Sequence, residues 1–248
     1  MFGIFNKSTY LVDQLEGMID MHNHILPGID DGAKNLDDSL ALLRAFNAFG
    51  ITDFIATPHI HSDLYPNTPE SIDQSYQSLI SEIHKHPDLH AVSIDKAAEH
   101  LVDVQYESFL DEKQIVPMKK QYMLVEMSFL QPSLNFDAAI TKTQNMGYFP
   151  ILAHPERYAF LHGDISRYQR YKSMGIYFQV NLLSLAGHYG TTIQKESFHL
   201  LKEGLVDFIG SDVHNTNHIQ SLKKGKIPKN MTPFIKEKVM NGVNFFLD

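Results

Sequence analysis

Short apolar runs alternate with helical patterns along most of this chain, and most of the apolar runs close on a polar or charged residue. Continuous hydrophobic runs of about four to eight residues are typical of strands buried on both faces of a parallel sheet. They predict seven strands, at 18–22, 53–57, 91–98, 121–127, 148–153, 176–181 and 206–211. Helical spacing predicts helices at 37–49, 68 or 71 to 83, 137–146, 165–174, 192–203 and 232–241. This order indicates parallel strands joined by helices.

Each unit of strand and helix takes about 30 residues, which is the length of a β–α unit. Seven predicted strands are one fewer than the usual barrel has, so we expect a (β/α) barrel with irregular closure. No linker or low-complexity stretch divides the chain, and 248 residues fit one barrel. We therefore expect a single barrel domain over 18–248, preceded by an N-terminal extension over 1–17.

The composition restricts the chemistry that the chain can perform. It contains no cysteine, which excludes disulfides, thiolate metal sites and a cysteine nucleophile. Any transition-metal site must use imidazole and carboxylate ligands, and the 14 histidines supply many candidates. The net charge of −8 argues against a nucleic-acid partner. Because no apolar stretch reaches roughly 18 residues and the N-terminus lacks a signal-peptide pattern, we expect no membrane insertion and a cytoplasmic location.

Two pairs of candidate metal ligands follow predicted strands with the same spacing. His22 and His24 close the first strand, and Asp212 and His214 follow the last. Residues two apart on an extended strand point to the same side, so each pair can reach one ion. In a (β/α) barrel the carboxyl ends of the strands meet at the active site. The alternatives are two surface histidines, and an Asp212 that caps a helix starting near Asn215.

Two carboxylates also end largely apolar stretches. Glu99 and Glu126 are expected to be buried there, and a buried carboxylate without a partner is costly. The partner is either a metal ion or a buried arginine. Because the chain has only four arginines, we favour metal ligation for both carboxylates.

His59 and His154 each lie next to a proline, which fixes the local backbone and hence the direction of the imidazole. We expect both to be ligands. Arg157 follows at the mouth of the predicted pocket, where a planar cation beside metals suits a phosphate oxygen. A salt bridge from Arg157 to a local acid such as Glu156 is the alternative. His61, two residues beyond His59, is left open between substrate contact and solvent.

The complete set of predicted ligands exceeds what one ion needs, since zinc uses three or four. It consists of His22, His24, Asp31, His59, Glu99, Glu126, His154, Asp212 and His214. Three ions match this inventory, especially if one carboxylate bridges two of them. Nitrogen and oxygen ligands of this kind suit manganese, iron or zinc. Clustered metals favour phosphoester hydrolysis, because they activate water and clamp the attacking and leaving oxygens.

Four strings resemble motifs of the PHP (polymerase and histidinol phosphatase) superfamily. They are 22–33 (HNHILPGIDDGA), 56–59 (ATPH), 154–158 (HPERY) and 210–215 (GSDVHN). The LPGIDDG and HPERY strings are similar to those of CpsB/YwqE-type bacterial tyrosine-protein phosphatases of capsule and exopolysaccharide operons. The resemblance covers about residues 18–216.

The resemblance implies a distorted (β/α)7 barrel with a trinuclear, manganese-type centre. It implies a first metal held by His22, His24, Glu99 and Asp212, a second held by Glu99, Glu126 and His154, and a third held by Asp31, His59 and His214. Arg157 would orient the phosphate. For the proton donor, His59, His61 and a metal-bound water stay open. The implied substrate is phosphotyrosine on the tail of a bacterial tyrosine autokinase.

Three other functions stay open at this point. They are a PHP phosphatase of a small phosphoester such as histidinol phosphate, a nuclease or proofreading PHP domain, and an inactive scaffold that binds the kinase tail. Net charge argues against the second, and the complete ligand set argues against the third. The segment 215–218 carries no arginine, so a second phosphate-binding arginine is not expected there.

Overall fold

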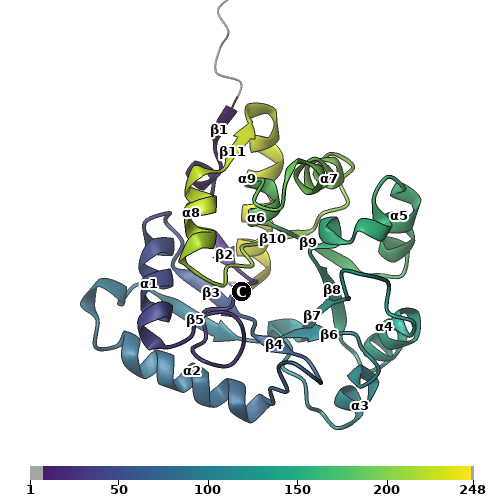
Figure 1. Ribbon diagram of the computed structural model, residues 1–248, viewed down its shortest axis with the longest axis horizontal. Helices are drawn as coiled ribbons and strands as arrows, with labels where there is room; N and C mark the ends of the chain where they lie inside the picture. The colour runs from purple at the N-terminus through teal and green to yellow at the C-terminus, as the bar shows by residue number, and fades with distance from the viewer. Residues whose placement is uncertain (1–7, 247–248) are drawn as a thin grey trace, which may run out of the picture.

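Seven parallel strand positions form the centre of the fold, and helices surround them (Figure 1). The computed structural model describes residues 8–246, so residues 1–7 of the predicted extension and residues 247–248 lie outside the described part. The strands are β2 (Ile19–Asp20), β3 (Asp53–Ala56), β4 (His59–Ile60), β5 (Ser93–Lys96), β6 (Glu99–Leu101), β7 (Tyr122–Glu126), β8 (Phe149–Ala153), β9 (Tyr177–Asn181) and β10 (Phe208–Gly210). All seven predicted strands are present, and the second and third are each followed by a further short strand, β4 and β6, just beyond their predicted ends. The expected α/β fold is confirmed.

The helices alternate with these strands, as the sequence predicts. They are α1 (Leu36–Asn47), α2 (Pro69–Ile83), α3 (Tyr106–Asp111), α4 (Phe136–Asn145), α5 (Ile165–Ser173), α6 (Leu182–Leu185), α7 (Thr191–Lys202), α8 (Thr216–Lys224) and α9 (Thr232–Phe246). The short helices α3 and α6 go beyond the prediction. The helix considered near Asn215 is present as α8, but Asn215 caps it, so the alternative of Asp212 as its cap is wrong. Within residues 8–246 we find no helix with the length and apolar character that a membrane crossing requires.

The strands follow one another around a ring, but their hydrogen-bonded ladder is interrupted. One sheet has the order β2-β3-β5 and the other β10-β9-β8-β7-β6-β4. The break between β3 and β4 falls at Pro58, which has no N–H to donate. Beside β2 and β10, a single parallel bridge joins Asn23 to Val213, and the Asp212 N–H donates to the His22 carbonyl over 2.7 Å. The seven strands therefore form an open, distorted ring instead of a continuously closed barrel.

The interior of the ring is filled by hydrophobic side chains below the strand ends. Ile19, Ile55, Leu124 and Ile151 form one buried cluster, which Phe246 of α9 joins. Ahead of the ring, β1 (Ser8–Tyr10) pairs antiparallel with β11 (Lys226–Pro228). Leu11 and Leu15 of the predicted extension are fully buried in the larger core. The extension is therefore packed against the body in its described part, and the boundary at residue 17 stays a prediction.

His100 on β6 faces away from the site and sits in the core as a neutral side chain. Its Nδ1 donates to the Leu124 carbonyl over 3.0 Å, and its Nε2 accepts from the Val116 N–H over 3.2 Å. An imidazolium could not accept the second bond. Burial is the main reason that the pKa of His100 is lowered to about 4.

This shift makes stability depend on pH. Unfolding returns His100 to a pKa of about 6.5, so its contribution is complete above that pH and is lost as the pH falls towards 4. When the pH is lowered from 7.5 to 4.5, the free energy of unfolding of the parent protein should fall. In His100→Gln this fall should be smaller by about 2 to 3 kcal/mol. Urea titrations of metal-free protein at both pH values measure this, with His199→Gln on exposed α7 as control. Equal pH dependence in parent and His100→Gln would contradict the assignment.

Candidate metal centre

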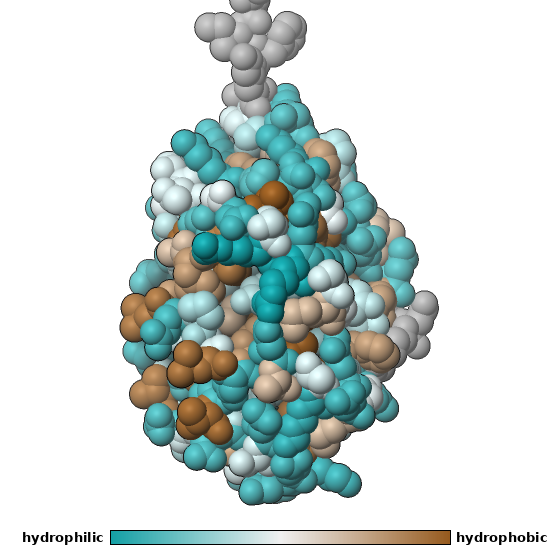
Figure 2. Space-filling model, turned by 90° about the vertical axis from the view of Figure 1, so that its right-hand side faces the viewer, coloured by the Kyte–Doolittle hydropathy of each residue, from teal (hydrophilic) through white to brown (hydrophobic). Residues whose placement is uncertain are grey.

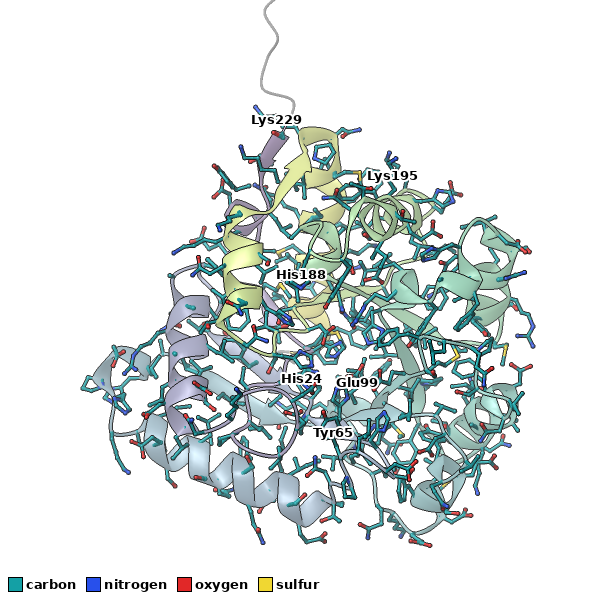
Figure 3. All side chains as sticks on the ribbon, in the orientation of Figure 1. His24, Tyr65, Glu99, His188, Lys195 and Lys229 are labelled. Atoms are coloured by element: carbon teal, nitrogen blue, oxygen red, sulfur yellow. The ribbon has the colours of Figure 1, made fainter. Side chains whose placement is uncertain are left out.

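The nine predicted ligands meet in one cluster at the carboxyl ends of the strands. Figure 3 shows His24 and Glu99 near the centre of the fold with Tyr65 next to them, whereas Lys195 and Lys229 lie at the periphery. The cluster faces a cavity of about 300 Å³. Seven predicted ligands line this cavity, namely Asp31, His59, Glu99, Glu126, His154, Asp212 and His214. His22 and His24 are fully buried beside them.

Glu99 is the centre of the cluster. Its Oε2 lies 3.2 Å from His22 Nε2 and 3.5 Å from His24 Nε2. The same oxygen lies 3.2 Å from His59 Nδ1, and Oε1 lies 2.9 Å from His154 Nε2. One buried carboxylate therefore touches four imidazoles that come from three different strand positions.

Several of these atoms are buried without a hydrogen-bond partner in the described residues. They are His22 Nε2, His24 Nε2, His59 Nδ1, His154 Nδ1 and Glu99 Oε2. An unpaired polar atom costs about 1 to 3 kcal/mol when it is buried, so a group of them in one place indicates a missing partner. The lone pairs of neutral imidazole and ionised carboxylate are the donors that divalent transition metals accept. The cluster therefore fits divalent cations.

The donor atoms fall into four overlapping groups, within each of which they lie at most 4.8 Å apart. The groups are His24, Asp31, His59 and His214; His22, His24 and Asp212; His22, Glu99 and His154; and His59, Glu99 and Glu126. They contain every predicted ligand. They place His22, His24 and His59 in two groups each, whereas the three implied ligand sets use each of these residues once. Which residues share an ion stays a prediction.

In metal-free protein, electrostatic interactions determine which side chains of the cluster carry protons. Burial alone raises the pKa of Glu99, yet the facing imidazoles of His22 and His59 lower it well below its ordinary value. For His24, burial lowers the pKa, but Asp30 and Asp212 raise it well above the ordinary value. Metal-free protein therefore keeps protons on imidazoles that face carboxylates, and metal binding must displace them.

Two residues that the sequence reasoning missed hold the imidazoles in place. Gln179 Oε1 lies 2.7 Å from His22 Nδ1, and Asp30 Oδ2 lies 2.8 Å from His24 Nδ1. Both oxygens accept, so the network assigns a proton to each Nδ1, and each Nε2 is the atom that can bind a metal once its own proton is displaced. Gln179 also donates to Asn181, which donates to Asp212 over 2.5 Å. The available signals were the Asp-Asp pair at 30–31 and the two-residue spacing of polar side chains on β9.

The backbone near the ligands is tight and strained. His154 and Asp212 adopt positive φ angles of 37° and 55°, a region that L-residues other than glycine rarely occupy. A Cβ at Gly32 would lie 2.2 Å from the His24 carbonyl oxygen, and one at Gly210 would lie 2.6 Å from His22 Cβ. Such strain gathers where the surrounding structure imposes a functional geometry.

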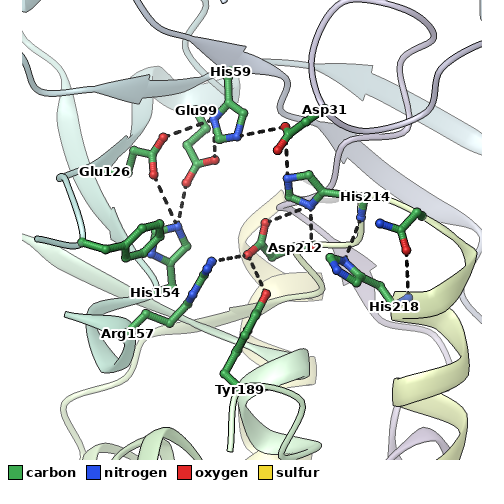
Figure 4. Close-up of a pocket in the computed structure, with 12 residues that line it drawn as sticks. Asp31, His59, Glu99, Glu126, His154, Arg157, Tyr189, Asp212, His214 and His218 are labelled. Atoms are coloured by element: carbon green, nitrogen blue, oxygen red, sulfur yellow. Dashed lines mark hydrogen bonds and ion pairs between the residues drawn. The ribbon is translucent and has the colours of Figure 1, made fainter. Parts of the chain in front are cut away.

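Arg157 enters the cavity from the loop after β8 (Figure 4). Its Nη1 donates to Asp212 Oδ2 over 2.9 Å, so the alternative pairing with Glu156 is wrong. Glu156 instead accepts from the Asn181 N–H in the core. The guanidinium lies between two rings, 4.3 Å from the centroid of Phe129 and 4.2 Å from that of Tyr189.

Two other histidines flank the site. His218 lines the cavity, accepts from the His214 N–H, and has a pKa lowered to about 4, mainly by burial and then by His214. The sequence reasoning did not select it. His61 is not among the cavity-lining residues, and its ring centroid lies 6.1 Å from that of His59. Its role stays a prediction.

A seven-stranded α/β ring with histidines and carboxylates at its carboxyl end is the arrangement of PHP-class metal-dependent hydrolases. The chain belongs to the CpsB/CapC family of capsular polysaccharide synthesis, whose family model matches residues 18–229. The family prediction is confirmed.

Individual relatives agree with this assignment. The tyrosine-protein phosphatase YwqE of Bacillus subtilis (strain 168) is 33% identical over 205 residues, which cover 80% of this chain and 78% of that protein. The putative tyrosine-protein phosphatase CapC of Staphylococcus aureus is 30% identical over 211 residues, covering 84% and 81%. A crystal structure from work on YwqE of B. subtilis and CpsB of Streptococcus pneumoniae, described as metal-dependent tyrosine phosphatases, has a TM-score of 0.76 and 28% identity, covering 90% and 95%.

The contact between Gln179 and His22 generates a test of the cluster. Gln179→Leu removes the acceptor that fixes the His22 tautomer, so we expect Mn²⁺ affinity to fall about 10- to 100-fold. Calorimetric titration of metal-free protein measures the affinity, and Gln220→Leu on exposed α8 is the matched control. Unchanged affinity in Gln179→Leu would show that this contact does not orient a ligand.

Proposed function

We propose that this chain is a metal-dependent phosphomonoesterase that hydrolyses phosphotyrosine in proteins. The named relatives are tyrosine-protein phosphatases, and the matching crystal structure is described as metal-dependent. The observation that carries the proposal is the convergence of buried, unpaired imidazole and carboxylate atoms beside a cavity that also holds Arg157. Such a cavity offers metal ligands and a phosphate contact together.

We propose three divalent ions, with manganese as the metal and iron or zinc as alternatives that the same donors accept. His22, His24, Glu99 and Asp212 would hold the first, Glu99, Glu126 and His154 the second, and Asp31, His59 and His214 the third. When bound, divalent ions supply an activated water and neutralise charge on the phosphoryl oxygens.

Arg157 is the proposed phosphate contact. Its guanidinium has five donors in a planar fork, and only Nη1 is bound to Asp212 in the described structure. Phe129 and Tyr189 restrain it from both faces, so little side-chain freedom remains to be lost on binding. The same two rings give the cavity aromatic walls, which suit the phenyl ring of phosphotyrosine.

The leaving group determines whether the protein must also supply a strong general acid. Tyrosine has a pKa of about 10, so its phenolate departs without a strong general acid. We propose His59 as the group that returns the proton, since it lines the cavity. His61 is the proposed contact for parts of the substrate beyond the cavity.

We propose that the substrate is the phosphorylated tail of a bacterial tyrosine autokinase that controls capsule or exopolysaccharide synthesis. The family description and the named relatives support this pathway.

The direct test compares substrates on metal-loaded protein. We expect Mn²⁺-loaded enzyme to hydrolyse a phosphotyrosine peptide, and His154→Ala to lose that turnover, with exposed His199→Ala as control. Histidinol phosphate is the competing substrate. Turnover of histidinol phosphate alone would replace the proposed function by that of a small-molecule phosphatase. Failure to bind metal would support the scaffold alternative.

Arg157 provides a separate prediction about the phosphate contact. Lysine keeps the charge but loses the fork, so Arg157→Lys should lower kcat/KM for phosphotyrosine about 10- to 100-fold, which corresponds to one charge-assisted hydrogen bond. Metal content, measured by elemental analysis, should stay at the parent level. Parent-like kcat/KM would exclude Arg157 from phosphate binding, and lost metal would assign it to maintaining Asp212.

A further inference from the structure

Hydrophobic side chains gather on the surface beside the cavity. Figure 2 looks at the side of the molecule that carries α3, α4 and α5, and it shows hydrophobic residues along one edge of this face. The exposed large residues nearby in the fold include Leu64 (67%), Val104 (85%), Leu130 (91%) and the fully exposed Leu134. They come from the loops that follow β4, β6 and β7. Scattered exposed leucines are normal, but several around one hollow indicate a binding surface.

A groove of about 520 Å³ lies among these loops, and we call it the loop groove. Val104 and Leu134 contribute to its apolar lining, and Asp63, Asp103 and Glu107 supply carboxylates. Among its described lining residues there is no lysine or arginine. Lys142 on α4 is close by, but it already binds the Asp111 carboxylate and the Glu107 carbonyl. The loop groove is therefore both apolar and negatively charged.

One loop lines both the loop groove and the proposed catalytic cavity. Phe129 lines the cavity, while its neighbours Ser128 and Gln131 line the groove, all on the loop after Glu126. Ser62 donates to Asp103 over 2.6 Å, which ties the loop after His59 to the loop after Glu99. A chain that leaves the cavity past Phe129 would enter the groove directly.

We propose that the loop groove binds the segment next to the phosphotyrosine, and that it selects a segment carrying an aliphatic or aromatic side chain together with lysine or arginine. This inference rests on the proposed function. The apolar side chain would cover Val104 and Leu134, and the cation would face Asp63, Asp103 and Glu107. Opposite charges across such a rim act on the rate of association and on partner choice.

The test compares two phosphotyrosine peptides that differ only in flanking residues, one with leucine and lysine and one with serine. We expect kcat/KM for the first to be at least about tenfold higher, from one buried leucine and one or two surface ion pairs. Asp63→Lys and Leu134→Ser should each reduce this preference about threefold to tenfold. Both side chains are exposed, so neither change removes a core contact.

The matched control is Glu203→Lys at the end of α7, which makes the same charge change away from the groove. It should leave the preference intact. If Glu203→Lys and Asp63→Lys reduce the peptide preference equally, the effect comes from net charge and the proposed role of the loop groove is wrong. If the two peptides are hydrolysed with equal kcat/KM while para-nitrophenyl phosphate is hydrolysed normally, the proposed role of the loop groove is also wrong. Absence of para-nitrophenyl phosphate hydrolysis would overturn the proposed function itself and the inference with it.

A second copy of the chain is the competing occupant. Sedimentation of parent and Leu134→Ser protein tests this possibility. If the parent self-associates and Leu134→Ser dissociates without altering peptide preference, the loop groove is a contact between copies and the proposal is wrong. If association is the same in both proteins and peptide preference falls, substrate docking is supported.

Discussion

The carboxylate of Glu99 is fully buried and lies within 3.5 Å of imidazole nitrogens from four histidines. An ionised carboxylate cannot be buried alone without a large desolvation penalty, and in metal-free protein the protons on the facing imidazoles are its main balance, beside the cation of Arg157. Two or more divalent ions would displace those protons and supply the positive charge in their place. Arg157 is held by the same cluster, because its Nη1 donates to the carboxylate of Asp212.

The fold brings these groups together by interrupting its own sheet. Pro58 breaks the ladder next to His59, and the close packing of Gly210 against His22 lets β10 approach β2. Positive φ angles at His154 and Asp212 turn both side chains into the cluster. An ideal barrel would satisfy more backbone hydrogen bonds but would leave less room for side chains to converge. We infer that the irregular closure is part of the site's construction.

The sequence predicted the strands and the polar side chains that meet at their carboxyl ends, because both depend on local patterns. A buried strand is a continuous apolar run, and a polar residue directly after it must lie at the carboxyl end of the sheet. The partners of the ligands depend on contacts across the fold. Gln179 is 157 residues from His22, and nothing local to either residue indicates their hydrogen bond. The pairing of Arg157 with Asp212, 55 residues away, is of the same kind, since the sequence offered only a local acid such as Glu156 as the alternative to a phosphate contact.

Anomalous X-ray diffraction from crystals of Mn²⁺-loaded protein tests the central claim most directly. The account predicts anomalous peaks among the nine candidate ligands, with Glu99 in contact with more than one ion. Crystals with measured manganese content but no peak in this cluster would contradict it, and the buried histidines would then need another partner.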